Sequence, residues 1–136
     1  MDLYKAMAVS AAGMKAQGTR LKVIAENLAN ANSTAETPGD LPYRRKVVVF
    51  QNMMDRQMQV DTVRVAKVDL DKKDFERRYD PSHPSADADG YVLLPNVNSL
   101  VEAMDMREAQ RSYEANLNVI DSSRQMLMRT IDILRT

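Results

Sequence analysis

The chain has 136 residues, which is enough for one domain of ordinary size. Nineteen basic and nineteen acidic residues leave a formal net charge of zero, which argues against the basic surface of a nucleic-acid-binding protein. The chain has no cysteine, so disulfides, thiolate metal ligands and thiol catalysis are excluded. No apolar run approaches the roughly 18 residues that a membrane-spanning helix needs, so direct membrane insertion is not expected.

The N-terminal part predicts one long helix, capped by Asp2 and ending near Ala29. Its seam residues recur alternately every four and three positions, which places them on one narrow line of the kind that packs against a partner helix. The mildly apolar run at residues 6–14 lacks the Leu, Ile and Phe of a secretory signal, so we expect a mature helix and not a cleaved signal. The seam consists of Leu3, Met7, Ser10, Met14, Gln17, Leu21, Ile24 and Leu28.

Two glycines lie inside this helix, Gly13 and Gly18, and each costs about 1 kcal/mol relative to alanine. The small residues Ala11, Gly18 and Ala25 recur every seven positions beside the seam. Either they admit the backbone of a neighbouring helix or the helix is weak in isolation, and the sequence allows both.

The middle of the chain predicts short strands joined by loops. Proline, glycine and asparagine mark residues 30–42 as a loop. Residues 51–59 are expected to form a helical turn or a mobile connection between two strands. Pro81 and Pro84 stop any regular element, because neither can donate to a ladder. The expected strands span residues 43–50, 60–68, 75–79 and 91–94.

The C-terminal part predicts a second helix from Ser99 to about Leu134, without an internal Gly or Pro. Ser99 and Glu102 have the spacing of a capping box, in which each side chain bonds the backbone of the other. Gln110 and Arg124 lie within its seam, where polar groups lower stability but select register and partner. The seam follows Met106, Gln110, Tyr113, Leu117, Ile120, Arg124, Leu127, Ile131 and Leu134.

The predicted fold class is α+β: mostly α, with a small β insertion between two long terminal helices. These helices pair antiparallel or at a shallow angle as a coiled-coil-like core. Residues 1–34 and 97–136 are expected to form this helical core domain, and residues 35–96 a β-rich insertion. Whether the insertion is a compact sheet or an extended hairpin arm stays open.

An isolated pair of helices buries one seam, which rarely offsets the backbone ordering entropy of about 1–2 kcal/mol per residue. We therefore expect the ends to be mobile in the free monomer and to order when copies stack. The predicted subunit-interface residues are Leu3, Met7, Met14, Leu21, Ile24, Leu28, Met106, Tyr113, Leu117, Ile120, Leu127, Ile131 and Leu134.

A cluster of possible metal ligands lies at Asp80, His83, Asp87 and Asp89. As a calcium loop it lacks an acidic residue at the first position and the bidentate glutamate at the last. A zinc site would need a second histidine or a cysteine, and His83 is the only histidine. We therefore expect a rigid surface turn, in which Asp87 and Asp89 bind turn amides and Gly90 takes a positive φ, and no cofactor.

No other motif predicts catalysis or ligand binding. The basic cluster at residues 44–46 has no aromatic platform and the chain has no net positive charge, so nucleic acid is not expected as a partner. Neither a Gly-x-Ser-x-Gly elbow nor a Gly-rich phosphate loop is present. We predict a structural role without catalytic residues.

Several motifs resemble those of bacterial flagellar rod and hook proteins. The run Asn27-Leu28-Ala29-Asn30 is similar to the signature that ends the first helix in that family. Further blocks, spread over essentially the whole chain, narrow the resemblance to proximal-rod proteins of the basal body. They contain Pro42, Tyr43, Arg44 and Arg45; Pro81, His83 and Pro84; Gly90, Tyr91 and Val92; Pro95, Asn96, Val97 and Asn98; and Tyr113 and Asn116.

This resemblance implies an axial protein of the periplasmic rod, exported unfolded by the flagellar type III apparatus without a cleaved signal peptide. It implies polymerisation with copies of itself, with adjacent proximal and distal rod subunits, and with the adaptor between rod and membrane ring. The product would be a helical drive shaft around the export channel. We place Asn27, Asn30, Asn96 and Asn116 as candidate hydrogen-bonding groups near helix ends and seams.

The residues themselves leave two alternatives. A generic cytoplasmic coiled-coil adaptor would fold cooperatively as a dimer through the same seams. A small metal-dependent enzyme or sensor would be built around His83, with too few ligands in its favour.

Overall fold

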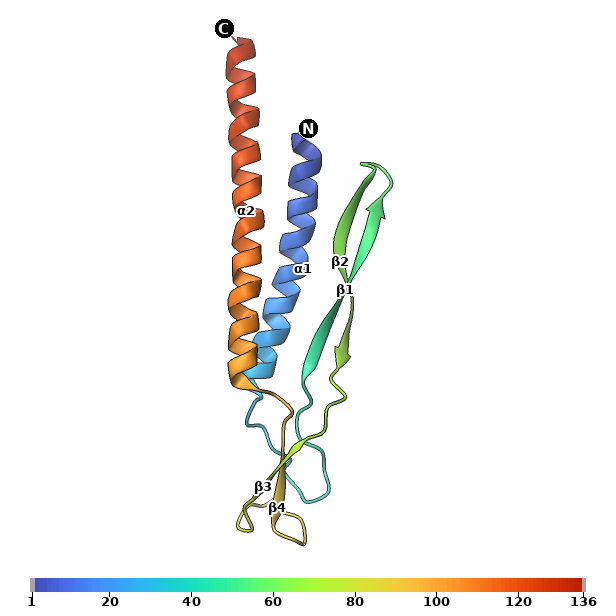
Figure 1. The fold of residues 1–136 in the computed structure, drawn as a ribbon, viewed down its shortest axis with the longest axis vertical. Coiled ribbons are helices and arrows are strands. Elements are labelled where there is room, and N and C mark those ends of the chain that lie inside the picture. The colour runs from blue at the N-terminus through green and yellow to red at the C-terminus, as the bar shows by residue number, and fades with distance from the viewer. Residues whose placement is uncertain (1, 136) are drawn as a thin grey trace.

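The computed structural model describes residues 2–135 and is dominated by two long helices. Helices α1 (Leu3–Ala29) and α2 (Ser99–Arg135) lie side by side and run antiparallel, and α2 extends past the start of α1 (Figure 1). This arrangement, with a small β-rich segment between the helices, confirms the predicted α+β fold class.

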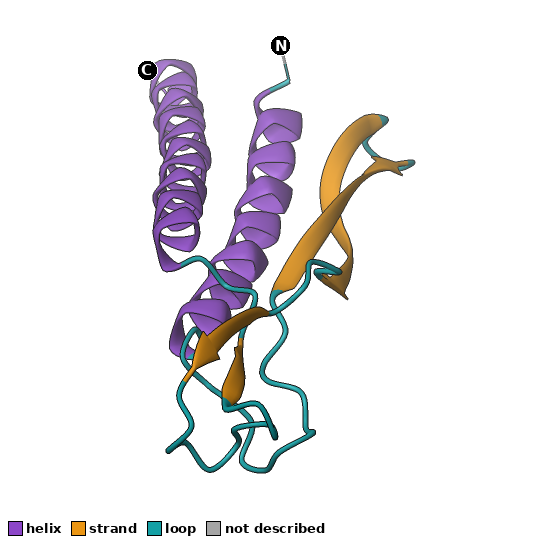
Figure 2. Ribbon diagram, turned by 60° about the horizontal axis from the view of Figure 1, so that its bottom comes forward, coloured by secondary structure: helices purple, strands orange, loops and turns teal. Residues whose placement is uncertain are grey.

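The middle segment forms two separate two-stranded antiparallel sheets. Strands β1 (Lys46–Asp55) and β2 (Val60–Leu70) make a long hairpin that lies alongside α1. Strands β3 (Glu76–Tyr79) and β4 (Tyr91–Leu94) pair among the loops at the end of the molecule away from both termini (Figure 2). The insertion is therefore an extended hairpin arm beside a small loop-rich end, and not one compact sheet.

Helix α1 begins and ends where its sequence predicts. Asp2 caps it, and its carboxylate accepts a hydrogen bond from the Tyr4 amide at 3.0 Å. Asn30 ends it, with its backbone amide bonded to the Glu26 and Leu28 carbonyls and its side-chain amide donating to the Glu26 carbonyl at 2.9 Å. The residues that follow form a loop and do not continue the helix.

The predicted capping box at the start of α2 is wrong. Asn98, and not Ser99, caps the helix: its side-chain oxygen accepts from the amides of Leu100 at 3.0 Å and Val101 at 3.3 Å. Asparagine and serine cap helices about equally well, and the residue before Ser99 takes the role. This frees Glu102, whose side chain turns into the protein and is 1% exposed.

Small residues lie at the contact between the two helices. The buried residues of α2 are Glu102, Ala109 and Ser123, and those of α1 include Ser10 and Gly13. A Cβ added at Gly13 would lie 2.7 Å from Nδ2 of Asn116, so a larger residue at position 13 would require the Asn116 side chain to move. Gly13 thus leaves room for this side chain of α2.

The contact line on α2 differs from the predicted seam. Ala109, Asn116 and Ser123 lie towards α1, and each precedes by one position the predicted seam residues Gln110, Leu117 and Arg124, all of which are exposed. The two lines share Met106, Tyr113, Ile120 and Leu127, all half-buried. The contact within the chain therefore uses a line rotated from the one that apolar periodicity selects.

The hairpin is longer than its sequence predicts. Residues 51–55 continue β1, and neither a helical turn nor a mobile connection is present there, because they pair with residues 60–64 of β2. The register shifts between Val49 and Phe50, a bulge that increases the local twist of the hairpin visible in Figure 2. Only a short turn remains at the tip, where Asp55 accepts from the amides of Gln57 and Met58.

The described residues contain no helix that combines the length and apolar composition needed to cross a bilayer.

Candidate assembly interface

A buried asparagine at the end of α1 joins the three main parts of the molecule. The Asn27 side chain is fully buried. Its amide nitrogen donates to the Lys46 carbonyl at 2.8 Å and to Glu102 Oε2 at 3.1 Å. Its oxygen accepts from the Lys46 amide at 2.9 Å and from the Tyr43 hydroxyl at 2.9 Å. All four bonds that a carboxamide can make are therefore formed, and they tie α1 to the starts of β1 and α2.

Glu102 brings a buried charge to the same place. Its carboxylate bonds the Arg45 guanidinium as well as Asn27. Nη1 of Arg45 also lies 3.2 Å from Oδ2 of Asp71, and its Nη2 lies 3.6 Å from Oδ2 of Asp105. Burial alone would lower the pKa of Arg45, but the bonds and charges of Glu102 and Asp71 outweigh it and raise that pKa. The buried carboxylate is thus paired, which is the condition for tolerating it inside a protein.

Asp71, after β2, and Asn96, after β4, complete this cluster. Asn96 accepts from the Arg45 amide at 2.7 Å and donates to the Asp71 and Lys73 carbonyls at 3.2 and 3.1 Å. The Lys73 amide and Arg45 both bond the Asp71 carboxylate and lower its pKa. Burial raises the pKa of Tyr43, whose hydroxyl donates to Asn27.

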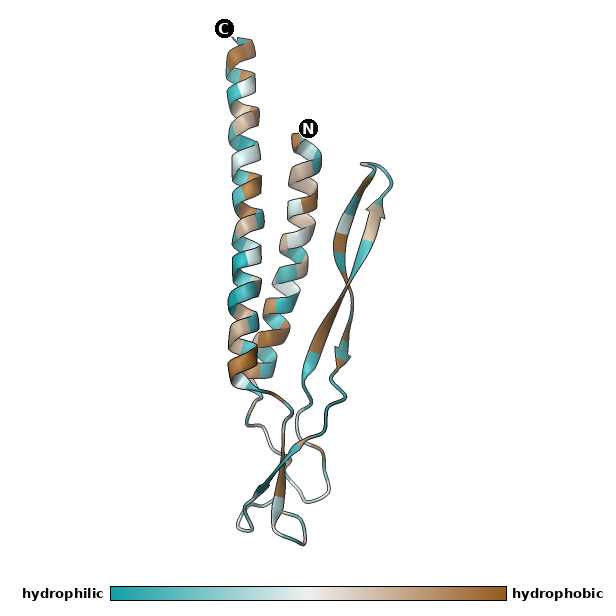
Figure 3. Cartoon of the chain, viewed as in Figure 1, coloured by the Kyte–Doolittle hydropathy of each residue, from teal (hydrophilic) through white to brown (hydrophobic). Residues whose placement is uncertain are grey.

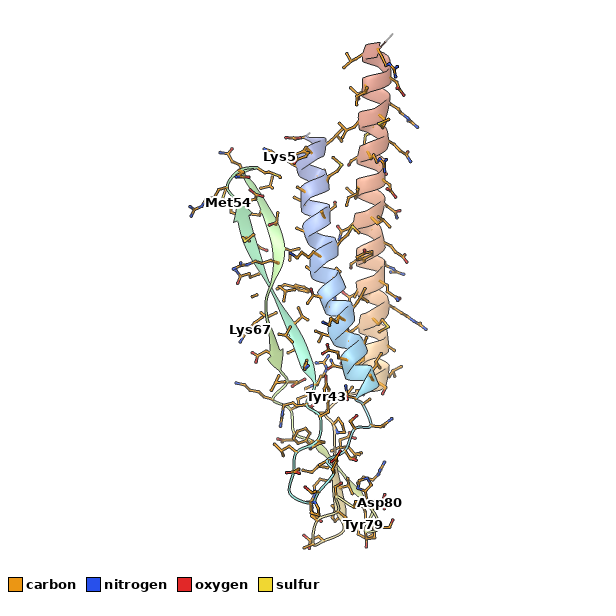
Figure 4. All side chains as sticks on the ribbon, turned by 180° about the vertical axis from the view of Figure 1, so that it is seen from behind. Lys5, Tyr43, Met54, Lys67, Tyr79 and Asp80 are labelled. Carbon is orange, nitrogen blue, oxygen red and sulfur yellow. The ribbon has the colours of Figure 1, made fainter. Side chains whose placement is uncertain are left out.

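We call this cluster the polar junction. It consists of Asn27, Tyr43, Arg45, Asp71, Asn96 and Glu102. Figure 4 shows Tyr43 where the ends of the helices meet the base of the hairpin. The junction fixes the hairpin relative to both helices, because its members come from four separate stretches of the chain and bond one another directly.

Four members of the polar junction belong to the sequence motifs and two were missed. The motifs include Asn27, Tyr43, Arg45 and Asn96, whereas Glu102 was interpreted as a capping residue and Asp71 carries no local signal. Glu102 lies seven positions before Ala109, on the line of Ala109, Asn116 and Ser123 that faces α1, and no apolar pattern marks that line in the sequence.

The other motif residues build the loop-rich end. His83 Nδ1 accepts from the Ser85 amide at 3.1 Å, and its Nε2 lies 3.3 Å from the Thr34 hydroxyl, which links two loops. Gly90 has φ of +81°, and a Cβ there would lie 3.0 Å from the Tyr79 ring. The Asp87 carboxylate accepts from the Asp89 and Tyr91 amides, as a rigid turn requires.

Other motif residues are buried or make contacts within the chain. Pro42, Val92 and Pro95 are buried, and Val97 is half-buried. Tyr91 packs edge-on against Tyr79 with ring centres 5.3 Å apart. Arg44 donates to the Asp71 and Lys73 carbonyls and lies over the Phe75 ring, and Asn30 accepts from the Ser33 hydroxyl.

No group of three or more potential metal ligands comes together within residues 2–135. Asp87 is engaged with turn amides and Arg77, and His83 with Ser85 and Thr34.

The predicted interface residues differ widely in exposure. Ile24 is buried, whereas Leu117, Ile131 and Leu134 are exposed. The others are half-buried: Leu3, Met7, Met14, Leu21, Leu28, Met106, Tyr113, Ile120 and Leu127. Their role in contacts between subunits stays a prediction.

Helix α2 therefore buries Ala109 and Ser123 and leaves many of its large apolar residues exposed. Figure 3 shows hydrophobic positions recurring along α2 as far as its C-terminal end. On α1, Ala11 and Ala25 are exposed and no atom lies within 4 Å of a Cβ built at Gly18, so this small-residue line has no partner within the described chain. The exposed large apolar residues of α2 are Leu100, Val101, Met104, Leu117, Val119, Met126, Met128, Ile131, Ile133 and Leu134.

These features define a structural subunit made of paired terminal helices with a rigidly attached arm. Comparison with known families agrees with this class. The Flagella basal body rod protein model matches residues 7–35, and the Flagellar basal body rod FlgEFG protein C-terminal model matches residues 88–133.

Full-length relatives identify the family within that class. Flagellar basal-body rod protein FlgC of Agrobacterium fabrum is 48% identical over 133 residues, covering 98% of this chain and 96% of the relative. The FlgC proteins of Borreliella burgdorferi and Salmonella typhimurium are 39% and 37% identical, with at least 98% of each chain covered. The chain belongs to the FlgC family of flagellar basal-body rod proteins, and is a structural subunit of the rod.

Proposed function

We propose that the chain is a subunit of the proximal rod and polymerises with other axial proteins into a helical tube around the flagellar export channel. The observation that supports this most directly is the exposure of large apolar side chains along α2. Ala109 and Ser123 are buried against α1, while Leu117 and Met128 face solvent. In the folded chain, this helix therefore still exposes apolar surface that is available for contact with another molecule.

The energetic argument favours assembly over a solitary helix pair. Fully burying one large apolar side chain is worth about 1.5–3 kcal/mol, whereas small residues such as Ala109 and Ser123 contribute less. Most hydrophobic stabilisation available to α2 is therefore realised only when another molecule covers it. Ordering of the ends and docking of subunits would then be coupled, as the sequence predicts.

The polar junction would supply the stiffness that a rotating shaft needs. Asn27 and Glu102 are both nearly fully buried and bonded to two other segments. Such bonds have fixed geometry, so the hairpin arm and the helices would turn as one body. We therefore propose that the helical core (1–34 and 97–136) and the insertion (35–96) make different contacts in the rod. The connection between them is rigid.

The proposed partners are copies of this chain, adjacent proximal and distal rod subunits, the adaptor between rod and membrane ring, and the type III export apparatus. We propose that the chain passes unfolded through that apparatus without a cleaved signal peptide and acts in the periplasmic part of the basal body. The family names of its relatives support a basal-body location. We propose no catalytic activity and no cofactor.

A deletion and complementation experiment tests this function. Cells in which the gene is deleted should be non-motile, and a plasmid copy with a short epitope tag should restore swimming. The tagged chain should then be found in isolated basal bodies. Normal swimming of the deletion strain, or recovery of the tagged chain only as a cytoplasmic dimer, would contradict the proposal and favour the adaptor alternative.

A further inference from the structure

Helix α2 has four distinct sides. The side towards α1 carries Ala109, Asn116 and Ser123. A helix turns about 100° per residue, so Leu117 and Val119 point roughly 200° apart and lie on opposite flanks of that contact. Met128 lies eleven positions after Leu117, on nearly the same flank, and Met126 lies seven after Val119 on the other.

Between Arg107 and Arg129 the side opposite α1 is polar. Its residues are all exposed, and they suit contact with water better than contact with an apolar partner. They are Arg107, Arg111, Asn118, Gln125 and Arg129.

Both flanks carry a large apolar residue at the same two heights along the helix. Leu117 and Met128 are 40% and 54% exposed on one flank, and Val119 and Met126 are 43% and 48% exposed on the other. The members of each pair, 117 with 119 and 128 with 126, differ in height along the helix by only about 3 Å. Between the two levels each flank is polar, with Arg124 on one side and Ser122 on the other.

A shallow depression lies where the Leu117 flank borders the polar side of α2. Asp121, Arg124, Gln125 and Met128 line this depression on the helix surface together with Arg129 and Asp132. Four residues at this spacing form the hole that receives one side chain of a neighbouring parallel helix. At equal height the neighbour's Met126 is the side chain at that level.

A second copy fits this surface better than an unrelated partner. Each copy carries both flanks, and when two α2 helices stand parallel without an axial shift both apolar levels coincide. Contact between two different surfaces of one chain propagates and does not stop at a dimer. In this arrangement α2 contacts α1 on one side, water on the opposite side and the α2 helix of another copy on each flank. Such helices form a continuous layer.

We propose that α2 helices of neighbouring copies stand side by side in parallel at nearly equal height, with the Leu117–Met128 flank of one copy against the Val119–Met126 flank of the next. This inference rests on the proposed assembly and specifies which surfaces meet. It makes the contact heterologous, so identical flanks of two copies do not face one another.

Cysteine cross-linking tests the proposal cleanly, because the chain has no cysteine of its own. Variants carrying Leu117→Cys, Val119→Cys or both would replace the chromosomal copy. Isolated basal bodies would be treated with a short bis-maleimide and examined by denaturing electrophoresis. Helices packed side by side have axes about 8–10 Å apart, which such a reagent spans. The double variant should give dimers, trimers and larger products that neither single variant gives.

The matched control moves one cysteine by a single position. The Leu117→Cys and Asn118→Cys double variant should give no such series, because residue 118 lies on the polar side. Equal cross-linking of either single variant would show that like flanks meet and would overturn the proposal. Incorporation of all variants without any cross-linking would also overturn it while leaving rod membership intact. Absence of the unsubstituted chain from basal bodies would instead refute the proposed function.

Discussion

Replacing Glu102 with alanine is expected to lower the free energy of unfolding of the free chain by about 3 kcal/mol, a large part of a typical total of 5–15 kcal/mol. The substitution leaves Arg45 without its most buried partner, although Asp71 and Asp105 still lie within 3.6 Å. It also removes one acceptor of the Asn27 amide. Urea unfolding followed by circular dichroism measures the change.

Two control variants make this prediction specific. Glu102→Gln keeps the size and one accepting oxygen of the side chain, so it should cost less, about 1–2 kcal/mol. Glu108→Ala removes a carboxylate from the same helix that is 68% exposed and lies 3.6 Å from Arg20, so the unfolding free energy should change by less than about 0.5 kcal/mol. Equal effects of Glu102→Ala and Glu108→Ala would mean that the polar junction does not hold the chain together.

Replacing Leu117 with aspartate is expected to abolish assembly while leaving the free chain folded. Leu117 is 40% exposed in the free chain, so the new carboxylate can remain in water there. In an assembly that covers this flank the carboxylate would be buried without a partner, which costs several kcal/mol at each contact. Swimming in soft agar and the amount of chain in isolated basal bodies measure the loss.

The matched control for this change is Asn118→Asp, which adds the same charge one position away on the polar side of α2. Cells with this variant should swim, and both variants should keep the helical circular dichroism of the unsubstituted chain. Leu21→Asp tests the half-buried seam of α1 in the same assay and should also prevent assembly. Normal motility with Leu117→Asp would show that this flank takes no part in the rod.

Local sequence signals were enough to predict most of the secondary structure. Asp2 and the loop residues after Ala29 set the limits of α1, because capping and turn chemistry act over a few residues. Residues 51–55 could not be recognised as strand, since Gln51 and Asn52 break the apolar pattern. Their state is decided by pairing with β2.

The surfaces of α2 could be predicted only in part. Periodicity finds the apolar line but does not say whether the chain itself or a neighbour covers it. Ala109 and Ser123 carry almost no hydropathy signal, yet they form the contact with α1 because their size allows close approach. Leu117, the more apolar residue beside them, is left to solvent. This is the reverse of what hydrophobic patterning within one chain predicts.

The polar junction shows a different limit. The family resemblance located Asn27, Tyr43, Arg45 and Asn96 without giving their contacts. Glu102 fitted a capping box with Ser99. Its partners in the structure, Arg45 and Asn27, lie 57 and 75 positions away in the sequence, so the local pattern did not predict its role. Long-range bonds of this type leave no pattern in a single sequence.

Side-chain labelling of methionines tests the central claim most directly, namely that the apolar flanks of α2 are open in the free chain and covered in the rod. Met126 and Met128 are 48% and 54% exposed, and hydroxyl radicals oxidise exposed methionine to the sulfoxide. Mass spectrometry should find both residues readily oxidised in the free chain and strongly protected in isolated basal bodies. Equal oxidation of Met126 and Met128 in the two states, or protection already present in the free chain, would contradict the account.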